Sequence, residues 1–288
     1  MSKVLSYSLF EPKVLPSHRT HDKWLNERDR YWYNIPALVA INKILYPDYE
    51  MRLYLSKNVW QNPKSKIFET LEKVGNLKIH TIEMDYSGTE PSVWRMIPLW
   101  ELDTGILHCR DIDSIPTEKE HKYTLYFEES SNTVGTMRTH QNHHGIKCRM
   151  LAGLCSYKPN EIPVAIKFPN FQMYYAFKHG NYGCDQDLMI DIFTKNEQFT
   201  KDNFLDYHGY FQTNKQPFAC HTVSDSQLDK IETTKSQKDL LQFLKEKELD
   251  NWAGEPVDCR GEVTRKVLSF FEKIKFDNDL KTFYKIQD

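Results

Sequence analysis

The stretch that decides the fold is Ile106-Leu-His-Cys-Arg-Asp-Ile-Asp-Ser114, in which a short apolar run ends in two aspartates, Asp111 and Asp113. On an extended segment, residues i and i+2 point to the same side, so both carboxylates can lie at the tip of a buried strand. Such oxygen ligands suit Mg²⁺ or Mn²⁺, which often carry substrate phosphates. The simpler interpretation is a turn that ends the strand, because Asp and Ser favour turns.

The residues before this stretch alternate between strand-like and helix-like segments. Predicted strands cover residues 3–9, 51–56, 77–84 and 105–109, and predicted helices cover 36–46, 62–74 and 91–102, with a polar loop between the first strand and residue 30. Pro36 is placed at the first position of its helix, and Asn62-Pro63 caps the next one. The alternation predicts an α/β fold with a mostly parallel sheet flanked by helices. Ligands bind beyond the carboxyl ends of such strands, where Asp111 and Asp113 fall, so this position favours a binding site over a plain turn.

The second half of the chain is less regular. Predicted elements are a helix at 117–131, a strand at 133–138, a helix from about 181 to 193, and two more charged helices at 236–248 and 261–275. A polar cluster at 138–144 holds His140, His143 and His144, which we interpret as a substrate wall, as plain surface or, less favoured, as a zinc site.

Bulk composition narrows the class of protein. The chain has 288 residues, enough for one large domain or a domain with an added tail, and its net charge of −2 argues against a general nucleic-acid binder. The six cysteines form no Cys-x-x-Cys pair, which argues against a zinc ribbon and fits reduced thiols. We find no signal peptide and no apolar stretch that could span a membrane, so we expect a complete, cytoplasmic protein.

An ordered set of short motifs resembles the GT-A-type glycosyltransferases, in particular a small group with Arg-Asp-x-Asp-Ser, a His-containing segment, a Gly-rich segment and Tyr-Gly-x-Asp-Gln. The matching pieces are Ser6-Tyr-Ser-Leu-Phe10, Arg30-Tyr31, Tyr46-Pro-Asp48, Trp94-Arg95, Arg110-Asp-Ile-Asp-Ser114, Met137-Arg-Thr-His140 with His143, Met150-Leu-Ala-Gly-Leu154, Tyr182-Gly-Cys-Asp-Gln186 and Tyr207-His-Gly209. They span roughly residues 3 to 220. The sequence differs from the family's motifs at Thr139, Ala152 and 154–156. These differences affect the expected identity of the donor sugar more than the expected fold.

The resemblance implies a GT-A-like fold, a divalent ion (Mn²⁺ or Mg²⁺) and transfer of a hexose or pentose from a UDP-sugar to a hydroxyl of a glycan acceptor. Small soluble glycosyltransferases of large algal DNA viruses are similar in size and in lacking a membrane anchor, which points to a xylosyl- or related transferase in the host cytoplasm. We expect a catalytic domain over 1–223, with a nucleotide-sugar half (1–114) and an acceptor half (115–223). A helical C-terminal extension (224–288) is expected to pack on this domain.

The resemblance also assigns roles to individual residues. Asp113 and Asp111 are the expected metal ligands, with His208 as a candidate third ligand or else an ordinary histidine. Asp185 is expected to be the base of an inverting reaction, or simply a helix N-cap. The expected donor-binding residues are Tyr7, Ser8, Leu9, Arg30, Arg95, Asp111, Ile112 and Gly153, and the expected acceptor-binding residues are His140 and His143.

Bland alternatives remain for several of these residues. Tyr7 can be core, Arg30 a solvated surface residue, and Gly153 a site of close packing. Arg110 is either structural or part of the site. The alternative function is a metal-dependent phosphoesterase built on Asp111, Asp113 and nearby histidines, which would need a second metal and further carboxylates. A nucleotide-sugar-binding protein without catalysis is a third possibility.

Overall fold

The computed structural model describes residues 1–11, 21–74, 76–86, 88–139, 150–163, 183–189, 192–193, 199–207, 220–249 and 253–259, together with Asn251, Arg265, Lys266, Ser269 and Phe283. Of residues 21–29, 74 and 201, only the backbone is described. Most of the helix predicted at 261–275 lies outside these residues.

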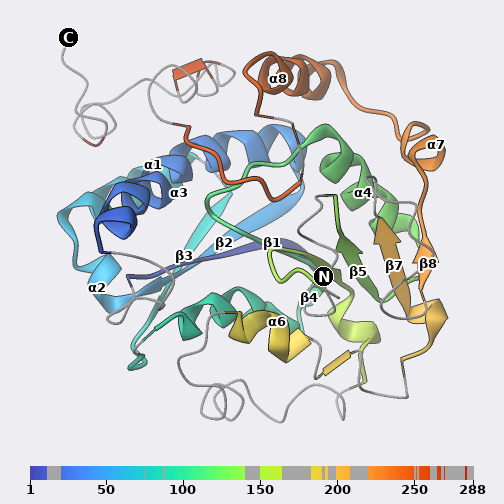
Figure 1. Ribbon diagram of the computed structural model, residues 1–288, viewed down its shortest axis with the longest axis horizontal. Helices are drawn as coiled ribbons and strands as arrows, with labels where there is room; N and C mark the ends of the chain where they lie inside the picture. The colour runs from blue at the N-terminus through green and yellow to red at the C-terminus, as the bar shows by residue number, and fades with distance from the viewer. Residues whose placement is uncertain are drawn as a thin grey trace.

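A mixed sheet forms the centre of the molecule (Figure 1). Across the described residues its eight strands run in the order β3-β2-β1-β4-β6-β5-β7-β8. The strands are β1 (Ser2–Leu9), β2 (Tyr49–Ser56), β3 (Leu77–Ile82), β4 (Thr104–Arg110), β5 (Val134–Met137), β6 (Leu154–Tyr157), β7 (Phe204–Tyr207) and β8 (His221–Thr222). Only β6 among them is antiparallel to its neighbours, β4 and β5. The predicted fold class, a mostly parallel α/β sheet flanked by helices, is confirmed.

Helices cover both faces of the sheet (Figure 1). On one face, α1 (His21–Leu45) and α3 (Lys66–Val74) pack on β1 and β2, and α8 (Lys235–Glu246) packs against α1. On the other face lie the 3₁₀ helix η2 (Glu90–Trp100) and the short helix α6 (Cys184–Met189). Because both faces are covered, Val4 to Leu9 of β1 form a continuous buried run, as expected for a central parallel strand.

Helix α1 begins much earlier than the sequence predicted. We expected a polar loop up to residue 30 and a helix that starts at Pro36, but the helix starts at His21 and Pro36 lies inside it. Proline removes one backbone hydrogen bond from a helix. Burial of neighbours such as Trp32 and Leu38 offsets this cost. As a result, Arg30 and Asn34 lie one helical turn apart and on the same face of α1.

The segment predicted as a helix at 91–102 is a 3₁₀ helix over Glu90–Trp100. Pro91 and Pro98 both lie in it, and a proline lacks the N–H that a continuous α-helix requires. The tighter winding buries Val93, Met96 and Leu99 against the sheet.

The remaining elements join these layers. They are α2 (Lys57–Trp60), η1 (Pro63–Ser65), α4 (Glu118–Glu129), η5 (Pro159–Glu161), η7 (Lys201–Asn203) and α7 (Asp225–Leu228). Thr117 caps α4 by accepting a hydrogen bond from the amide of Glu120 at 3.1 Å. None of the helices in the described ranges has both the length and the apolar character that a bilayer crossing requires. Within the same ranges, the cysteines are buried free thiols.

A buried histidine on α4 makes the stability of the fold depend on pH. His121 is fully buried, and its ring packs edge-on against Tyr46 at 5.1 Å. Burial, helped by the charge of Lys122, lowers the pKa of His121 to about 4. The unfolded chain, with a pKa near 6.5, therefore takes up this proton first as the pH falls. Stability that is present above about pH 6.5 is lost progressively down to about pH 4.

We expect His121→Leu to reduce the loss of stability between pH 6.5 and pH 4 by up to roughly 3 kcal/mol. Buried His108, whose pKa is also lowered by burial, accounts for part of the loss that remains. Urea unfolding at pH 7.5, 5.5 and 4.5 measures this, with the exposed His221→Gln as a control. An equally steep loss in His121→Leu would show that this histidine does not set the dependence.

Candidate functional site

The two aspartates of the opening motif lie at the point where the sheet changes direction. The chain forms β1, β2 and β3 in one direction and then returns to place β4 on the other side of β1. β1 and β4 are parallel neighbours, so their carboxyl ends meet at one edge. Open α/β sheets bind ligands at such a switch point. Asp111 and Asp113 follow β4 directly, and Ser8 and Leu9 end β1 beside them.

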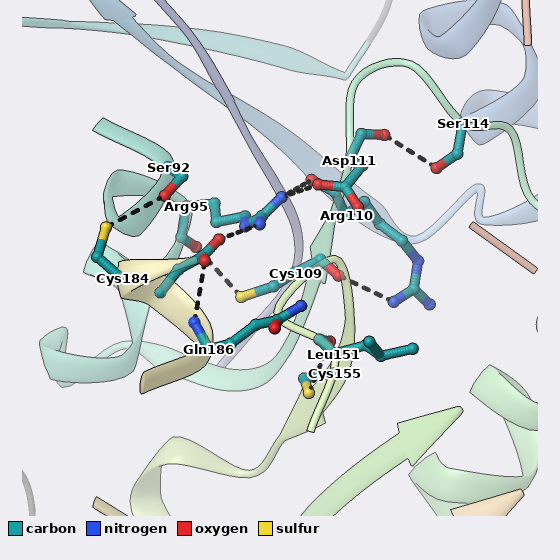
Figure 2. Close-up of polar contacts among 11 residues, drawn as sticks. Ser92, Arg95, Cys109, Arg110, Asp111, Ser114, Leu151, Cys155, Cys184 and Gln186 are labelled. Atoms are coloured by element: carbon teal, nitrogen blue, oxygen red, sulfur yellow. Dashed lines mark hydrogen bonds and ion pairs between the residues drawn. The ribbon is translucent and has the colours of Figure 1, made fainter. Parts of the chain in front are cut away.

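Arg95 of η2 joins two carboxylates that are distant in sequence. Its side chain is 7% exposed and forms ion pairs with Asp111 and with Asp185. It also donates to the carbonyl of Arg110 at 3.2 Å. Figure 2 shows Arg95 extending from its helix toward Asp111. One guanidinium therefore fixes the positions of two acidic groups, one after β4 and one at the start of α6.

Both oxygens of Asp185 are engaged by donors. One oxygen is paired with Arg95, and the other accepts a hydrogen bond from the amide of Gln186 at 2.9 Å. The side chain is 8% exposed, whereas that of Asp111 is 43% exposed. Asp185 thus lies deeper than Asp111, on the far side of Arg95.

Asp113 is held separately by α1 and by the C-terminal part of the chain. Arg30 donates to its carboxylate at 2.9 Å, and its backbone carbonyl accepts from the amide of Val257 at 2.7 Å. Burial first, and then the negative charge of Asp111, raise the pKa of Asp113 to about 6, while Arg30 opposes the shift. Arg30 is therefore paired with Asp113 and largely buried, and its expected role in donor binding stays a prediction.

Arg110 connects the end of β4 to helix α4. It forms a fully buried ion pair with Glu120 of α4 at 2.6 Å and donates to Thr124 at 3.0 Å. Arg110 was expected to be either a structural residue or part of the site. The structure favours a structural role, because its guanidinium joins the end of β4 to α4.

Asp111 and Asp113 could supply two of the ligands that a divalent ion needs. Among the described residues, no group of three His, Cys, Asp or Glu side chains is arranged to hold a metal. The chemistry of Asp111 and Asp113 nevertheless fits Mg²⁺ or Mn²⁺, because such ions commonly take one or two protein carboxylates and complete their shell with water and substrate phosphates. A cation would also relieve the repulsion that helps to raise the pKa of Asp113. Binding would compete with Arg30 and Arg95 for the same carboxylates.

Gly153 makes room for Asp111. A Cβ atom at position 153 would overlap the carboxylate of Asp111. The expected role of Gly153 was close approach of the backbone to the donor sugar; in the structure the close neighbour is this aspartate. A side chain at this position would push the carboxylate of Asp111 away from Arg95.

We expect Gly153→Ala to lower any activity that depends on Asp111 by about tenfold or more. The reason is that a displaced catalytic or binding group, here the carboxylate of Asp111, lowers a reaction rate by at least this factor. Gly105→Ala on the same sheet is the control, since its Cβ would meet Met1 and the carbonyl of Ser2, away from Asp111. Initial rates and far-ultraviolet circular dichroism of both variants test this. Equal rates in the two variants would argue against the packing role of Gly153.

The other predicted residues have different placements. Tyr7 lies in the core at 1% exposure, where its hydroxyl accepts from Asn42 at 2.9 Å, so its ring is not at the surface to stack on a base. Ile112 is also buried in the core beneath the site. His140, His143 and His208 lie outside the described residues, and their expected roles remain predictions.

Sequence reasoning missed the segment formed by residues 253–259. It crosses the carboxyl edge of the sheet beside the loop that follows β4 (Figure 1). Asn34 of α1 binds it at two points, donating to the carbonyl of Val257 and accepting from the amide of Cys259, both at 2.9 Å. The available sequence signal was the short apolar–polar–apolar run Val257-Asp-Cys259, which is too short to predict an ordered segment.

Comparisons with known proteins give structural likenesses at low sequence identity. No protein-family model matches the sequence, and no curated protein matches it. Among solved structures, the chain is similar to S. aureus TarS 1-349 in complex with UDP-GlcNAc, with 13% identity, a TM-score of 0.43, and coverage of 99% of this chain and 78% of that chain.

The chain is also similar to the solved structures of a synthase and of a galactosyltransferase. A 4-diphosphocytidyl-2C-methyl-D-erythritol synthase from Anaerococcus prevotii has 10% identity and a TM-score of 0.40, over 84% of this chain and 96% of that chain. The galactosyltransferase LgtC in complex with donor and acceptor sugar analogs has 12% identity and a TM-score of 0.37, over 66% of this chain and 70% of that chain. At these scores the likenesses do not decide between functions, so the site residues must carry that argument.

Proposed function

We propose that the protein is a metal-dependent glycosyltransferase that moves a sugar from a UDP-sugar to a hydroxyl of a glycan acceptor. The observation that carries this proposal is the pair Asp111 and Asp113 at the switch point of the sheet, with Arg95 linking Asp111 to Asp185. The ordered motifs that resemble GT-A-type glycosyltransferases support it. We further propose cytoplasmic action and UDP-xylose as the first donor to test.

The residues fit the demands of the reaction. Loss of a nucleoside diphosphate leaves negative charge that must be stabilised, while the sugar becomes oxocarbenium-like. A divalent ion bound by Asp111 and Asp113 would stabilise that negative charge as a Lewis acid. Arg95, one of the expected donor-binding residues, forms ion pairs with two carboxylates, and we propose that it also holds them in place.

Asp185 is proposed as the base that takes the proton of the acceptor hydroxyl in an inverting reaction. Asp185→Asn keeps the shape of the side chain and removes its charge. We expect turnover to fall by about a hundredfold or more while UDP still binds, since general-base contributions are of this size. The measurement is the initial rate of UDP release beside UDP affinity. Normal turnover would remove Asp185 from the mechanism, and loss of UDP binding would indicate a role in the donor site.

A phosphoesterase is the second candidate, and it finds less support. Two-metal hydrolysis needs ions about 3.5–4 Å apart and therefore more ligands than two aspartates. The described residues provide no third metal-binding side chain near Asp111 and Asp113.

The experiment that tests the proposal is a thermal-shift panel of UDP-xylose, UDP-glucose, UDP-galactose and UDP-N-acetylglucosamine, each with and without Mn²⁺ or Mg²⁺. A bound donor stabilises the folded state by about 2.7 kcal/mol at a hundredfold excess over its Kd. We expect a shift that requires the metal and is largest for one sugar. The absence of a shift with every donor, with or without metal, would reject the proposal, and p-nitrophenyl phosphate hydrolysis would then test the phosphoesterase.

A further inference from the structure

The 253–259 segment is held by hydrogen bonds at Ala253, Val257 and Cys259. The hydroxyl of Thr139, just after β5, accepts from the amide of Ala253 at 3.0 Å. Val257 donates to the carbonyl of Asp113 at 2.7 Å, and Asn34 holds the segment through Val257 and Cys259. These contacts draw the segment across the ends of β5 and β4 to α1.

The burial pattern of the segment shows which side chains face inward. Ala253, Val257 and Cys259 are buried, Glu255 is half-buried, and Pro256 and Asp258 are exposed. From Glu255 to Cys259 this alternation is that of an extended chain, in which residues i and i+2 share a side, whereas Ala253 and Gly254 form a turn. Glu255 therefore faces the body of the protein between the contact at Thr139 and the contact at Asp113.

One oxygen of Glu255 lacks a partner in this position. Its Oε2 atom is buried and accepts no hydrogen bond from any described residue, while Oε1 has a long contact of 3.5 Å with Asn251. A buried carboxylate oxygen without a donor is costly, and such a group in a native structure calls for an explanation. A ligand that donates a hydrogen bond is one explanation.

A second unpartnered atom lies on Arg30, which binds the carboxylate of Asp113. Arg30, whose terminal nitrogen binds Asp113, has a buried Nε that finds no acceptor among the described residues. An unused acceptor on Glu255, two residues before the amide that binds the carbonyl of Asp113, and an unused donor on Arg30 thus both belong to chain segments that contact Asp113, the expected metal ligand. A hydroxyl group can both donate and accept, whereas a phosphate would be repelled by Glu255.

We infer that Glu255 is a substrate-binding residue that accepts a hydrogen bond from a sugar hydroxyl of the molecule bound at Asp111 and Asp113. This inference rests on the proposed function and deepens it. The hydroxyl can belong to the ribose of the nucleotide or to the sugar that is transferred, and the two sources share the same chemistry.

The test compares Glu255→Gln with the wild-type chain and with Glu232→Gln, which makes the same charge change at an exposed position of the C-terminal region. Calorimetry with Mn²⁺ measures the affinities for UDP, 2′-deoxy-UDP, 3′-deoxy-UDP and the UDP-sugar that gives the largest thermal shift. Thermal unfolding without ligand is measured in parallel.

A ribose contact predicts that Glu255→Gln weakens UDP binding by about tenfold or more, with little effect on one of the deoxy analogues. A contact with the transferred sugar predicts unchanged UDP affinity and a similar loss for the UDP-sugar. In both cases the ligand-free protein should be as stable as the wild type or more stable, because an unpartnered buried charge has been removed.

Unchanged affinity for all four ligands in Glu255→Gln would overturn the inference while the proposed function stands. Lower stability of the ligand-free variant with unchanged affinities would also overturn it, since Glu255 would then be a structural residue. Failure of the wild-type chain to bind UDP or any UDP-sugar with Mn²⁺ would reject the proposed function, and the inference with it.

Discussion

Replacing Asp113 with asparagine is expected to abolish metal-dependent transfer while the fold is retained. The substitution removes a negative charge from a two-aspartate site and leaves a neutral amide, which is a weaker ligand for Mg²⁺ or Mn²⁺. Loss of a group that stabilises charge in the transition state typically costs a factor of about 100 to 1,000 in rate. Transfer rates over a Mn²⁺ titration measure the effect, and we expect only a small part of the lost rate to return at high metal concentration.

Asp103 provides a matched control for this substitution. It lies just before the amino end of β4, at the opposite edge of the sheet, and its side chain is 74% exposed. Asp103→Asn makes the same chemical change at the other end of β4, away from the site, so its rate should equal that of the wild-type chain. Retained transfer in Asp113→Asn, or an equal loss in Asp103→Asn, would contradict the assignment of Asp113.

Replacing Arg95 with methionine is expected to lower both stability and activity. Asp111 and Asp185 would lose their shared counter-charge, and the buried Asp185 would keep only one donor. Removing one member of a buried ion pair costs about 3–5 kcal/mol. The lower value is more suitable here because Asp111 is partly exposed. In a chain of this size, we expect the Tm to fall by roughly 6 °C or more.

A second substitution separates the two effects. In the double variant Arg95→Met with Asp185→Asn, the buried charge that lost its partner is gone, so part of the stability should return while activity stays low. Arg52→Met is the control: Arg52 is also buried and pairs with Glu50 and Glu101, but it lies away from the site. The Arg52→Met variant should be less stable than the wild-type chain, but each folded molecule should keep the wild-type rate. Full activity of Arg95→Met would contradict the role of Arg95.

Sequence patterns predicted the first four strands of the sheet well. Strands β1 to β4 agree with prediction to within two residues at each end, because long apolar runs bounded by turn residues leave few alternatives. The start of α1 was missed because Pro36 is a strong start signal, and here burial of the residues around it overrides that signal. β6 was missed because four residues between loops carry too little periodicity to identify a strand.

The aspartates of the site were predictable, but their partners were not. Asp111 and Asp113 could be placed from a local motif and one positional rule. The Arg95 bridge joins residues 90 positions apart, and the contact between Asn34 and Cys259 joins residues 225 positions apart. No local pattern encodes such distant contacts, because they depend on how strands and loops pack in three dimensions. Glu255 was missed for the same reason.

The path of the 253–259 segment also has a consequence for the order in which the chain folds during synthesis. During synthesis, β2 can pair with β1 and β3 with β2 soon after each strand leaves the ribosome, and β4 can then join the exposed edge of β1. The segment that binds Asn34 and Asp113 is made about 140 residues after β4, and closing so long a loop is slow. A nascent chain can therefore hold most of its final architecture before the edge of the site is built, and competence for binding would arise as a separate, late event.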